Sequence, residues 1–429
     1  MRDTALWHPF SDMAAVRHSE VVLSRGEGIW LWDEDGNRYI DAAASLWYAQ
    51  IGHGRKEIAD AVAAQMQELE TYSCFAELAT PPARELAQML SDRAPMEGAK
   101  IFLVTGGGEA IDTAAKLGRL YHDVNGKSDR IHIVSRTNGY HGAHGFGTSI
   151  GGMPPNRVGF GPLITDTSQV EWDSVDSLEK KISEIGADNI ASFFFEPVIG
   201  AGGVLPPPEG YVEAITELCQ SLGILVVADA VICGFGRLGS WFGVERFDIK
   251  PDMITFAKGV TSGYMPVGGV VVSGRVAETF WSEPGRVAFR HGPTYAGHAA
   301  CCAAGIANIE IMEREGLVPR GQELENVLLD ALQPLADHEL VGEVRGGTGL
   351  LAAVDLDARI LERVPGAPNM AGVHIREAGA ITRPSLRGVP ISPPLTITPE
   401  EIGMIADSFR EGLDNFAKTD AVQGALAAA

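Results

Sequence analysis

The chain has 429 residues, 45% of them hydrophobic and 21% charged, with a formal net charge of −22. This composition is typical of a folded globular protein, and the negative charge disfavours nucleic acid as a partner because it would repel the phosphate backbone. No apolar stretch reaches the roughly 20 residues that span a bilayer, and the start MRDTALWHPF lacks the features of a signal peptide. We therefore expect no membrane partner and a cytoplasmic location.

The N-terminal part and the middle of the chain carry β-structure signals. GIWLWDEDGNRYIDAAASLW (28–47) predicts a hairpin whose turn is EDGN. The middle alternates short β-rich runs with amphipathic helical stretches, which predicts an α/β fold with a mainly parallel sheet covered by helices on both faces. The β-rich runs that matter most for function are 100–104, 191–196, 224–229 and 252–258.

From about Gly316 the pattern changes, and we expect a smaller α+β domain. The elements predicted there are a helix over 320–335, strands within 340–356 and 383–398, and a closing helix over 399–417. The tail AVQGALAAA (421–429) is expected to be weakly held. The predicted division is 1–59 for an N-terminal segment shared between the small domain and the substrate pocket, 60–318 for the large domain, and 319–429 for the C-terminal domain.

One lysine follows directly after a strand that should enter the core. Lys258 ends the run DMITFAK. Desolvation at a strand end disfavours the ammonium form, so the pKa falls and the neutral amine can attack a carbonyl to form a Schiff base. The alternative is an ordinary lysine whose amine extends into solvent. The five cysteines form no CxxC pair, so we expect reduced thiols and no metal site.

Three further features lie where ligands bind in open α/β sheets, beyond the carboxyl ends of strands. Asp229 ends the run ILVVAD, and its carboxylate could meet a cationic ring nitrogen or cap a helix. Gly106, Gly107 and Gly108 open a helix, and could hold a phosphate on backbone N–H groups or form a simple tight turn. Tyr140, in NGYHGAHG, offers a ring for stacking on a heterocycle or for core packing.

Together these residues resemble a family. The sequence is similar to the class III aminotransferases of the fold-type I pyridoxal phosphate (PLP) enzymes, and most similar to the ω-amino acid or amine:pyruvate transaminases. The resemblance covers nearly the whole chain and implies a seven-stranded sheet in the large domain. The segments that carry it are LWHPF, DAAASLWYAQIGHG, NGYHGAHG, FFFEPVIGAGGVLPPPEGY, VVADAVICGFGRLG, FAKGVTSGYMPVGG, HGPTYAGHAACCAA and RPSLRGVPISPPLTIT.

The resemblance implies a role for each cofactor-binding residue. Lys258 would bind PLP covalently and then move the proton between the substrate and the cofactor. Asp229 would pair with the pyridine nitrogen, between Val231 on one ring face and Tyr140 on the other. The phosphate would be held by three residues, namely Gly107 and Gly108 of the same chain and Thr294 of the neighbouring subunit. The site would then be complete only in a homodimer, which could pair further into a tetramer.

The resemblance also implies the substrate contacts. Trp47 and Phe10 would line the pocket, and Arg383 would bind a substrate carboxylate and swing away for apolar amines. Arg387 is close enough in the sequence to compete for that role. The amino group would pass from an amine or ω-amino acid to pyruvate or a similar keto acid by a ping-pong mechanism. Glu196 and Arg237 also match family positions, where we expect structural support.

Four residues in three segments depart from the pattern of the family. Gly106 and Gly108 stand where serines are usual, Ala230 replaces a glutamate, and Pro293 replaces a phenylalanine before Thr294. The missing hydroxyl donors predict a cofactor that is lost more easily than in a typical relative, because each hydrogen bond to an anion contributes roughly 1.5 to 3 kcal/mol.

The sequence also allows several alternative functions. GTSIG (147–151) fits the GxSxG pattern of hydrolase nucleophiles, but the prolines that follow disfavour the helix which that elbow requires. A non-catalytic binder of a phosphate ligand would need neither Lys258 nor Asp229. Within the family, the alternatives are an ornithine-type or diaminopelargonate-type transaminase and an aminomutase of the glutamate-semialdehyde kind.

Overall fold

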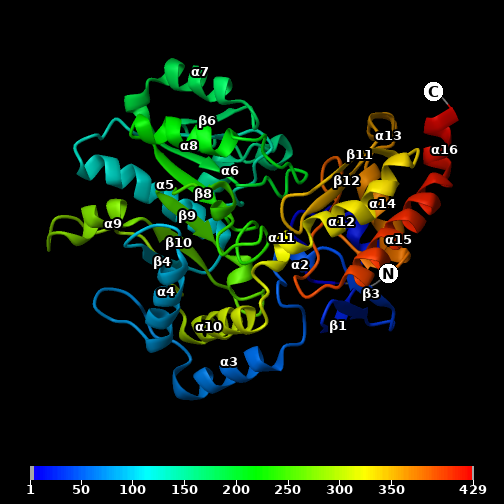
Figure 1. The fold of residues 1–429 in the computed structure, drawn as a ribbon, viewed down its shortest axis with the longest axis horizontal. Coiled ribbons are helices and arrows are strands. Elements are labelled where there is room, and N and C mark those ends of the chain that lie inside the picture. The colour runs from blue at the N-terminus through cyan, green and yellow to red at the C-terminus, as the bar shows by residue number, and fades with distance from the viewer. Residues whose placement is uncertain (1–3, 428–429) are drawn as a thin grey trace.

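A seven-stranded sheet forms the centre of the larger of two lobes in the computed structural model, which describes residues 4–427 (Figure 1). The strands lie in the order β4-β10-β9-β8-β7-β5-β6; β10 is antiparallel to both of its neighbours, and the other pairs are parallel. Their bounds are β4 Lys100–Val104, β5 His132–Arg136, β6 Thr167–Val170, β7 Ile190–Phe195, β8 Leu225–Asp229, β9 Met253–Phe256 and β10 Gly268–Val272.

Both faces of this sheet are buried. All six residues of β7 are buried, and its side chains alternate between two apolar clusters: Phe193 and Phe195 join one cluster, and Phe194 joins the other. Central strands of a parallel sheet are covered on both faces and therefore have continuous apolar sequences. The run IASFFF was predicted as such a strand, and this prediction is confirmed.

Helices cover the two faces of the sheet (Figure 1). On one face α5, α6 and α9 supply Ala110, Ile150 and Val276 to the core. The helices of the larger lobe are α3 Lys56–Leu69, α4 Pro81–Arg93, α5 Gly107–Val124, α6 Gly145–Ile150, α7 Val175–Ile185, α8 Tyr211–Ser221, α9 Gly274–Trp281 and α10 Ala299–Arg314.

The smaller lobe joins the two ends of the chain. One of its sheets has the order β1-β2-β3-β13, in which the N-terminal hairpin pairs with a C-terminal strand, so blue strands lie beside orange and red segments in Figure 1. A second sheet has the order β11-β12-β14. The strands are β1 Leu23–Glu27, β2 Trp30–Asp33, β3 Arg38–Asp41, β11 Val341–Arg345, β12 Ala352–Leu356, β13 Ala380–Ile381 and β14 Gly388–Ile391. The helices are α1 Met13–Ser19, α2 Ala44–Trp47, α11 Arg320–Glu323, α12 Glu325–Leu332, α13 Ala358–Arg363, α14 Ala367–Glu377, α15 Pro399–Ala417 and α16 Asp420–Ala427.

Most predicted elements are present, and two predictions are wrong. The tail is not weakly held as far as residue 427, because α16 buries Val422 and Ala425, and Arg363 Nη1 donates to the carbonyl of Ala425 at 2.8 Å. The single helix predicted over 320–335 is divided at Leu324 into α11 and α12, and then tightens into a 3-10 turn from Gln333. Pro334 lacks the N–H that an α-helix would need there.

Two expectations about membranes and metals can be compared with the described residues. Within residues 4–427, no helix combines the length and the apolarity needed to cross a bilayer. In the same range, His, Cys, Asp and Glu side chains do not gather in groups of three that could hold a metal ion. The five cysteines are all free thiols. The boundaries 1–59, 60–318 and 319–429 stay a prediction.

Candidate active site

Lys258 lies just beyond the end of a buried strand. Strand β9 ends at Phe256, and Lys258 begins a 3-10 turn (Lys258–Val260) with a φ of 50°, a region that non-glycine residues rarely adopt. Burial lowers the pKa of Lys258 to about 8, although the carboxylates of Asp229 and Glu196 act in the opposite direction. A much larger share of the side chain is therefore neutral amine at mildly basic pH than in an ordinary lysine, as a nucleophile requires.

Asp229 lies on the neighbouring strand with its carboxylate surrounded by donors. It is the last residue of β8 and is 4% exposed. Oδ1 accepts hydrogen bonds from Thr255 Oγ1 and from the backbone N–H of Val231, both at 3.1 Å. Oδ2 accepts from His141 Nδ1 at 2.8 Å. This network fixes the carboxylate at the carboxyl edge of the sheet, where a cationic ring nitrogen could meet it.

His141 is a site residue that our sequence reasoning missed. Its side chain is buried, its Nδ1 donates to Asp229, and its Nε2 has no partner among the described residues. A buried polar atom without a partner carries a desolvation cost, which is typical of a site completed by a bound group. The signal was present in NGYHGAHG, because His141 directly follows Tyr140.

Glu196 and Arg237 support the loops around the site. Glu196 is buried, which raises the pKa of its carboxyl group. Its two oxygens accept the backbone N–H groups of Tyr140 and Gly200, each at 2.9 Å, so Glu196 fixes the loop that carries Tyr140. Arg237 is fully buried and donates to the carbonyls of Leu350 and Pro393, at 3.0 and 2.7 Å. It thereby ties the large lobe to the C-terminal residues.

The glycine turn presents the N-terminus of an 18-residue helix. Gly107 and Gly108 begin α5, and no side chain caps its N-terminus at Gly106. A Cβ atom at Gly107 would lie 3.0 Å from Val231 Cγ1, and one at Gly108 would lie 3.1 Å from His144 Nδ1. The turn is therefore narrow, with backbone N–H groups left for an anion and with Val231 directly beside it.

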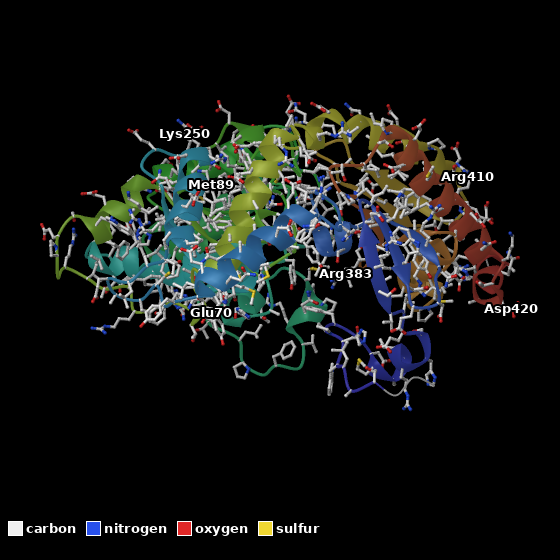
Figure 2. All side chains as sticks on the ribbon, turned by 90° about the horizontal axis from the view of Figure 1, so that it is seen from below. Glu70, Met89, Lys250, Arg383, Arg410 and Asp420 are labelled. Atoms are coloured by element: carbon white, nitrogen blue, oxygen red, sulfur yellow. The ribbon has the colours of Figure 1, made fainter. Side chains whose placement is uncertain are left out.

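Arg383 lies beside two aromatic rings. Its guanidinium carbon is 5.9 Å from the ring centre of Phe10 and 6.0 Å from that of Trp47. Phe10 also meets Tyr140 edge to face, at 6.4 Å between ring centres. Trp47 in turn lies under Lys258, whose Nζ is 5.2 Å from the indole centre. Figure 2 shows Arg383 between the two lobes, so these contacts join predicted substrate residues from both ends of the chain to the lysine.

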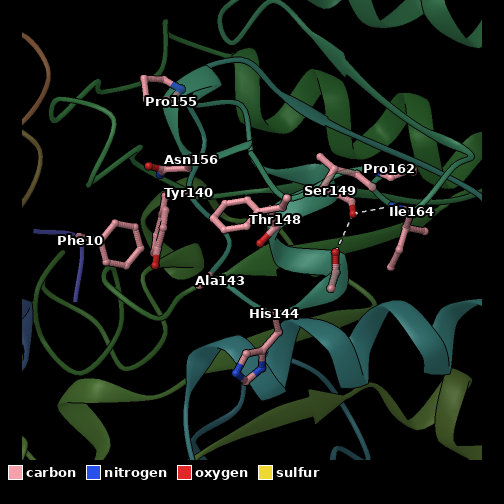
Figure 3. Close-up of a pocket in the computed structure, with 14 residues that line it drawn as sticks. Phe10, Tyr140, Ala143, His144, Thr148, Ser149, Pro155, Asn156, Pro162 and Ile164 are labelled. Atoms are coloured by element: carbon pink, nitrogen blue, oxygen red, sulfur yellow. Dashed lines mark hydrogen bonds between the residues drawn. The ribbon is translucent and has the colours of Figure 1, made fainter. Parts of the chain in front are cut away.

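A largely apolar cavity of about 410 Å³ opens beside Phe10 and Tyr140 (Figure 3). Ser149, the serine of the GxSxG pattern, lies in its wall but inside α6. Its Oγ donates to the carbonyl of Gly145 at 2.6 Å and accepts from Ile164 N at 3.0 Å. The hydroxyl is thus bonded within its own helix and is not presented on a strand-to-helix elbow, which excludes the hydrolase alternative.

Two of the residues considered from the sequence, Arg387 and Thr294, lie away from the other site residues. Arg387 is 60% exposed in its side chain and pairs with Asp355 at 3.2 Å, away from the aromatic rings that surround Arg383. Thr294 is exposed, and no hydrogen bond or ring contact among the described residues joins it to Lys258 or Asp229. The predicted contact of Thr294 with the cofactor of a neighbouring subunit stays a prediction.

Comparison with known proteins identifies the class. The family described as Aminotransferase class-III matches residues 13–413. The putrescine–pyruvate aminotransferase of Pseudomonas aeruginosa is 37% identical over 95% of this chain and 94% of its own length. The diaminobutyrate–2-oxoglutarate transaminase of Halomonas elongata is 34% identical over 95% and 93%. The solved structure of an amine transaminase from an uncultivated Pseudomonas species, in its PLP-bound form, has a TM-score of 0.91 at 34% identity and covers 96% of this chain and 99% of its own.

The fold and the site therefore define a PLP-dependent transferase of fold-type I. The chain belongs to the class III aminotransferases. The residues present fit the cofactor on structural grounds: an uncapped helix N-terminus for the phosphate, a bonded carboxylate at the edge of the sheet, a buried histidine nitrogen without a partner, and a lysine with a lowered pKa. Lys258, Asp229, Val231, Tyr140 and the glycine turn are the residues that would hold it.

Proposed function

We propose that this aminotransferase takes the amino group from a primary amine or an ω-amino acid and gives it to pyruvate or a similar keto acid. The observation that carries the proposal is the position of Arg383 beside two aromatic rings, one of which also lies beside Lys258. An arginine can pair with the carboxylate of a keto acid, and the rings can receive an apolar amine when that charge is absent. The putrescine–pyruvate relative supports the same choice of acceptor.

The chain's own groups supply positioning and proton transfer. PLP, when bound, stores the electrons that are released as the amino group is transferred. The Nζ atom of Lys258 has a pKa of about 8, so it can accept a proton from the substrate carbon and return it during the second half of the cycle. Asp229 would hold a ring nitrogen in its cationic form, and His141 fixes the carboxylate for that task. The buried surroundings exclude water from these groups.

The function is tested by following the two half-reactions separately. We expect an arylalkyl amine to bleach the long-wavelength absorbance band of the PLP-loaded protein, and pyruvate to restore it. The Lys258→Ala variant should not complete this cycle, because it lacks the amine that moves the proton. Recovery with 2-oxoglutarate but not with pyruvate would contradict the proposed acceptor and favour another branch of the family. Isomerisation of a substrate without any keto acid would favour an aminomutase.

The role of Arg383 is tested with two acceptors. Arg383→Ala should lower kcat/KM for pyruvate roughly 10- to 100-fold, the loss expected of a charge-assisted pair with a carboxylate. A carboxylate-free aldehyde should lose much less. Arg387→Ala is the matched control, because that side chain pairs with Asp355 at the surface. Equal losses for both acceptors in Arg383→Ala, or a selective loss in Arg387→Ala, would contradict the assignment.

The glycine turn makes retention of the cofactor testable. Gly106 has an extended φ of −175°, and a Cβ atom there would meet nothing within 4 Å, so a serine fits without strain. Gly106→Ser should slow the dissociation of PLP roughly tenfold by adding one hydroxyl donor worth about 1.5 kcal/mol. Gly106→Ala adds the same Cβ without the hydroxyl and should dissociate at the wild-type rate. Equal dissociation rates for the serine and alanine variants would show that the missing hydroxyl does not matter.

We also propose a homodimer with shared active sites, which could pair further into a tetramer. Support comes from apolar side chains exposed along the end of α3 and the segment that follows it: Met66, Leu69, Tyr72, Phe75 and Leu78. The loop of Thr294 adjoins them, since a Cβ atom at Gly292 would lie 3.7 Å from the ring of Phe75. Such patches on soluble proteins mark interfaces. Sedimentation of the PLP-loaded chain as a monomer at micromolar concentration would contradict the dimer.

The cytoplasmic location stays a prediction from the sequence.

A further inference from the structure

The indole of Trp47 lies beside two cationic side chains, and no hydrogen bond fixes it. Lys258 Nζ and the guanidinium carbon of Arg383 are 5.2 and 6.0 Å from its centre. Trp47 is 6% exposed, and its Nε1 has no partner among the described residues. The position of the ring therefore depends on apolar packing and on the backbone turn that carries it.

That turn has an unusual backbone conformation. Ala44, Ser45 and Trp47 have φ values of 43°, 59° and 59°, and Ser45 combines its φ with a ψ of −90°. Non-glycine residues seldom adopt such values, and three within four residues persist only where the surroundings hold them. The turn would relax if those surroundings were weakened, and the indole would move with it.

One carboxylate bonds the first half of the turn, and backbone bonds from Trp47 N to Ala43 O at 3.0 Å and from Tyr48 N to Ala44 O at 2.9 Å close its second half. Asp41 ends β3 and is fully buried. Its Oδ1 accepts from the backbone N–H groups of Ala43 at 3.1 Å and Ser45 at 2.9 Å. Its Oδ2 accepts from Ser45 N at 2.8 Å and from His53 Nε2 at 2.8 Å. Both oxygens are used, so an amide at this position, which has a single acceptor oxygen, cannot make the same set of bonds.

We propose that Asp41 is a positioning residue for transamination, which holds Trp47 between Lys258 and Arg383 by shaping the turn 43–47. A test by enzyme activity rests on the proposed function, whereas a test by chemical labelling of Lys258 does not. Without the carboxylate, the ring shifts, Arg383 loses one of its two aromatic neighbours, and water reaches Lys258. Acceptors that carry a carboxylate then suffer more than acceptors that lack one.

The same hairpin contains a matched control. Asp33 ends β2, is 7% exposed, and likewise shapes a turn with its carboxylate. Its Oδ1 accepts from the backbone N–H groups of Asp35 at 3.0 Å and Asn37 at 2.8 Å, and its Oδ2 accepts from Tyr39 Oη at 2.8 Å. Asp33→Asn therefore removes the same charge from an equivalent turn, but that turn carries no residue of the site.

The first measurement compares kcat and KM for pyruvate and for a carboxylate-free aldehyde. Asp41→Asn should raise KM for pyruvate roughly tenfold, the loss expected when a charged pair is weakened, with a much smaller change for the aldehyde. Asp33→Asn should leave the ratio of the two acceptors within about twofold of the wild type, since it disturbs only a remote turn. A purely structural role for Asp41 would lower both activities together and would overturn the proposal.

The second measurement needs no turnover. The full-length chain without added PLP is pulsed with acetic anhydride across a pH series, and acetylation of Lys258 is quantified by peptide mass spectrometry. Because burial lowers the pKa of Lys258 to about 8, the wild type and Asp33→Asn should show a midpoint near that value. Asp41→Asn should shift the midpoint upward, towards the ordinary value of about 10.4, because the amine is no longer shielded from water.

If Asp41→Asn does not fold, a milder variant can still test the role of Asp41. His53→Gln leaves the carboxylate in place but disturbs one of its four contacts. It should shift the acceptor ratio and the Lys258 midpoint in the same direction as Asp41→Asn, by a smaller amount. If the folded Asp41 and His53 variants match Asp33→Asn in both readouts, the proposal is wrong. A protein without aminotransferase activity would refute the proposed function, but the labelling result would still decide the role of Asp41.

Discussion

The whole site depends on keeping a lysine amine desolvated beside a carboxylate that is held by several donors. Parallel strands β8 and β9 achieve this through their register, because Asp229 lies opposite Thr255, three residues before Lys258. The threonine hydroxyl donates to Asp229, and the chain then turns so that the lysine emerges at the same edge. Burial lowers the pKa of the amine, and the donors around Asp229 fix its carboxylate, so one sheet edge provides both a nucleophile and a counter-ion.

The smaller lobe completes this centre with aromatic and cationic side chains. Phe10, Trp47 and Arg383 come from opposite ends of the chain, and they meet because β3 and β13 pair in one sheet. Arg237 connects the lobes through buried bonds to the carbonyls of Leu350 and Pro393. Under the proposed function, substrate selection would depend on the junction of the two lobes, while Lys258 and Asp229 belong to the edge of the large sheet.

Much of this arrangement could be predicted from the sequence, because local signals and strand ends agree. The strand 100–104 and the helix 399–417 match their predicted bounds, and the strand that was predicted to end at Asp229 does end there. His141 directly follows Tyr140 in the sequence, but its bond to Asp229 spans 88 residues, and the role proposed for Asp41 rests on an unusual turn, so the positions of strand ends indicated neither residue. The docking of α16 also depends on packing against α13, which is distant in the sequence, and a run of small residues does not reveal this contact.

The central claim is that Lys258 is the residue that binds the cofactor covalently. It is tested most directly by loading the protein with PLP, reducing it with borohydride and mapping the cofactor mass by peptide mass spectrometry. The account predicts one predominant labelled residue, Lys258, and no label at that position in the Lys258→Ala variant. Label on another lysine, or none at all in a protein that retains its PLP, would contradict the account.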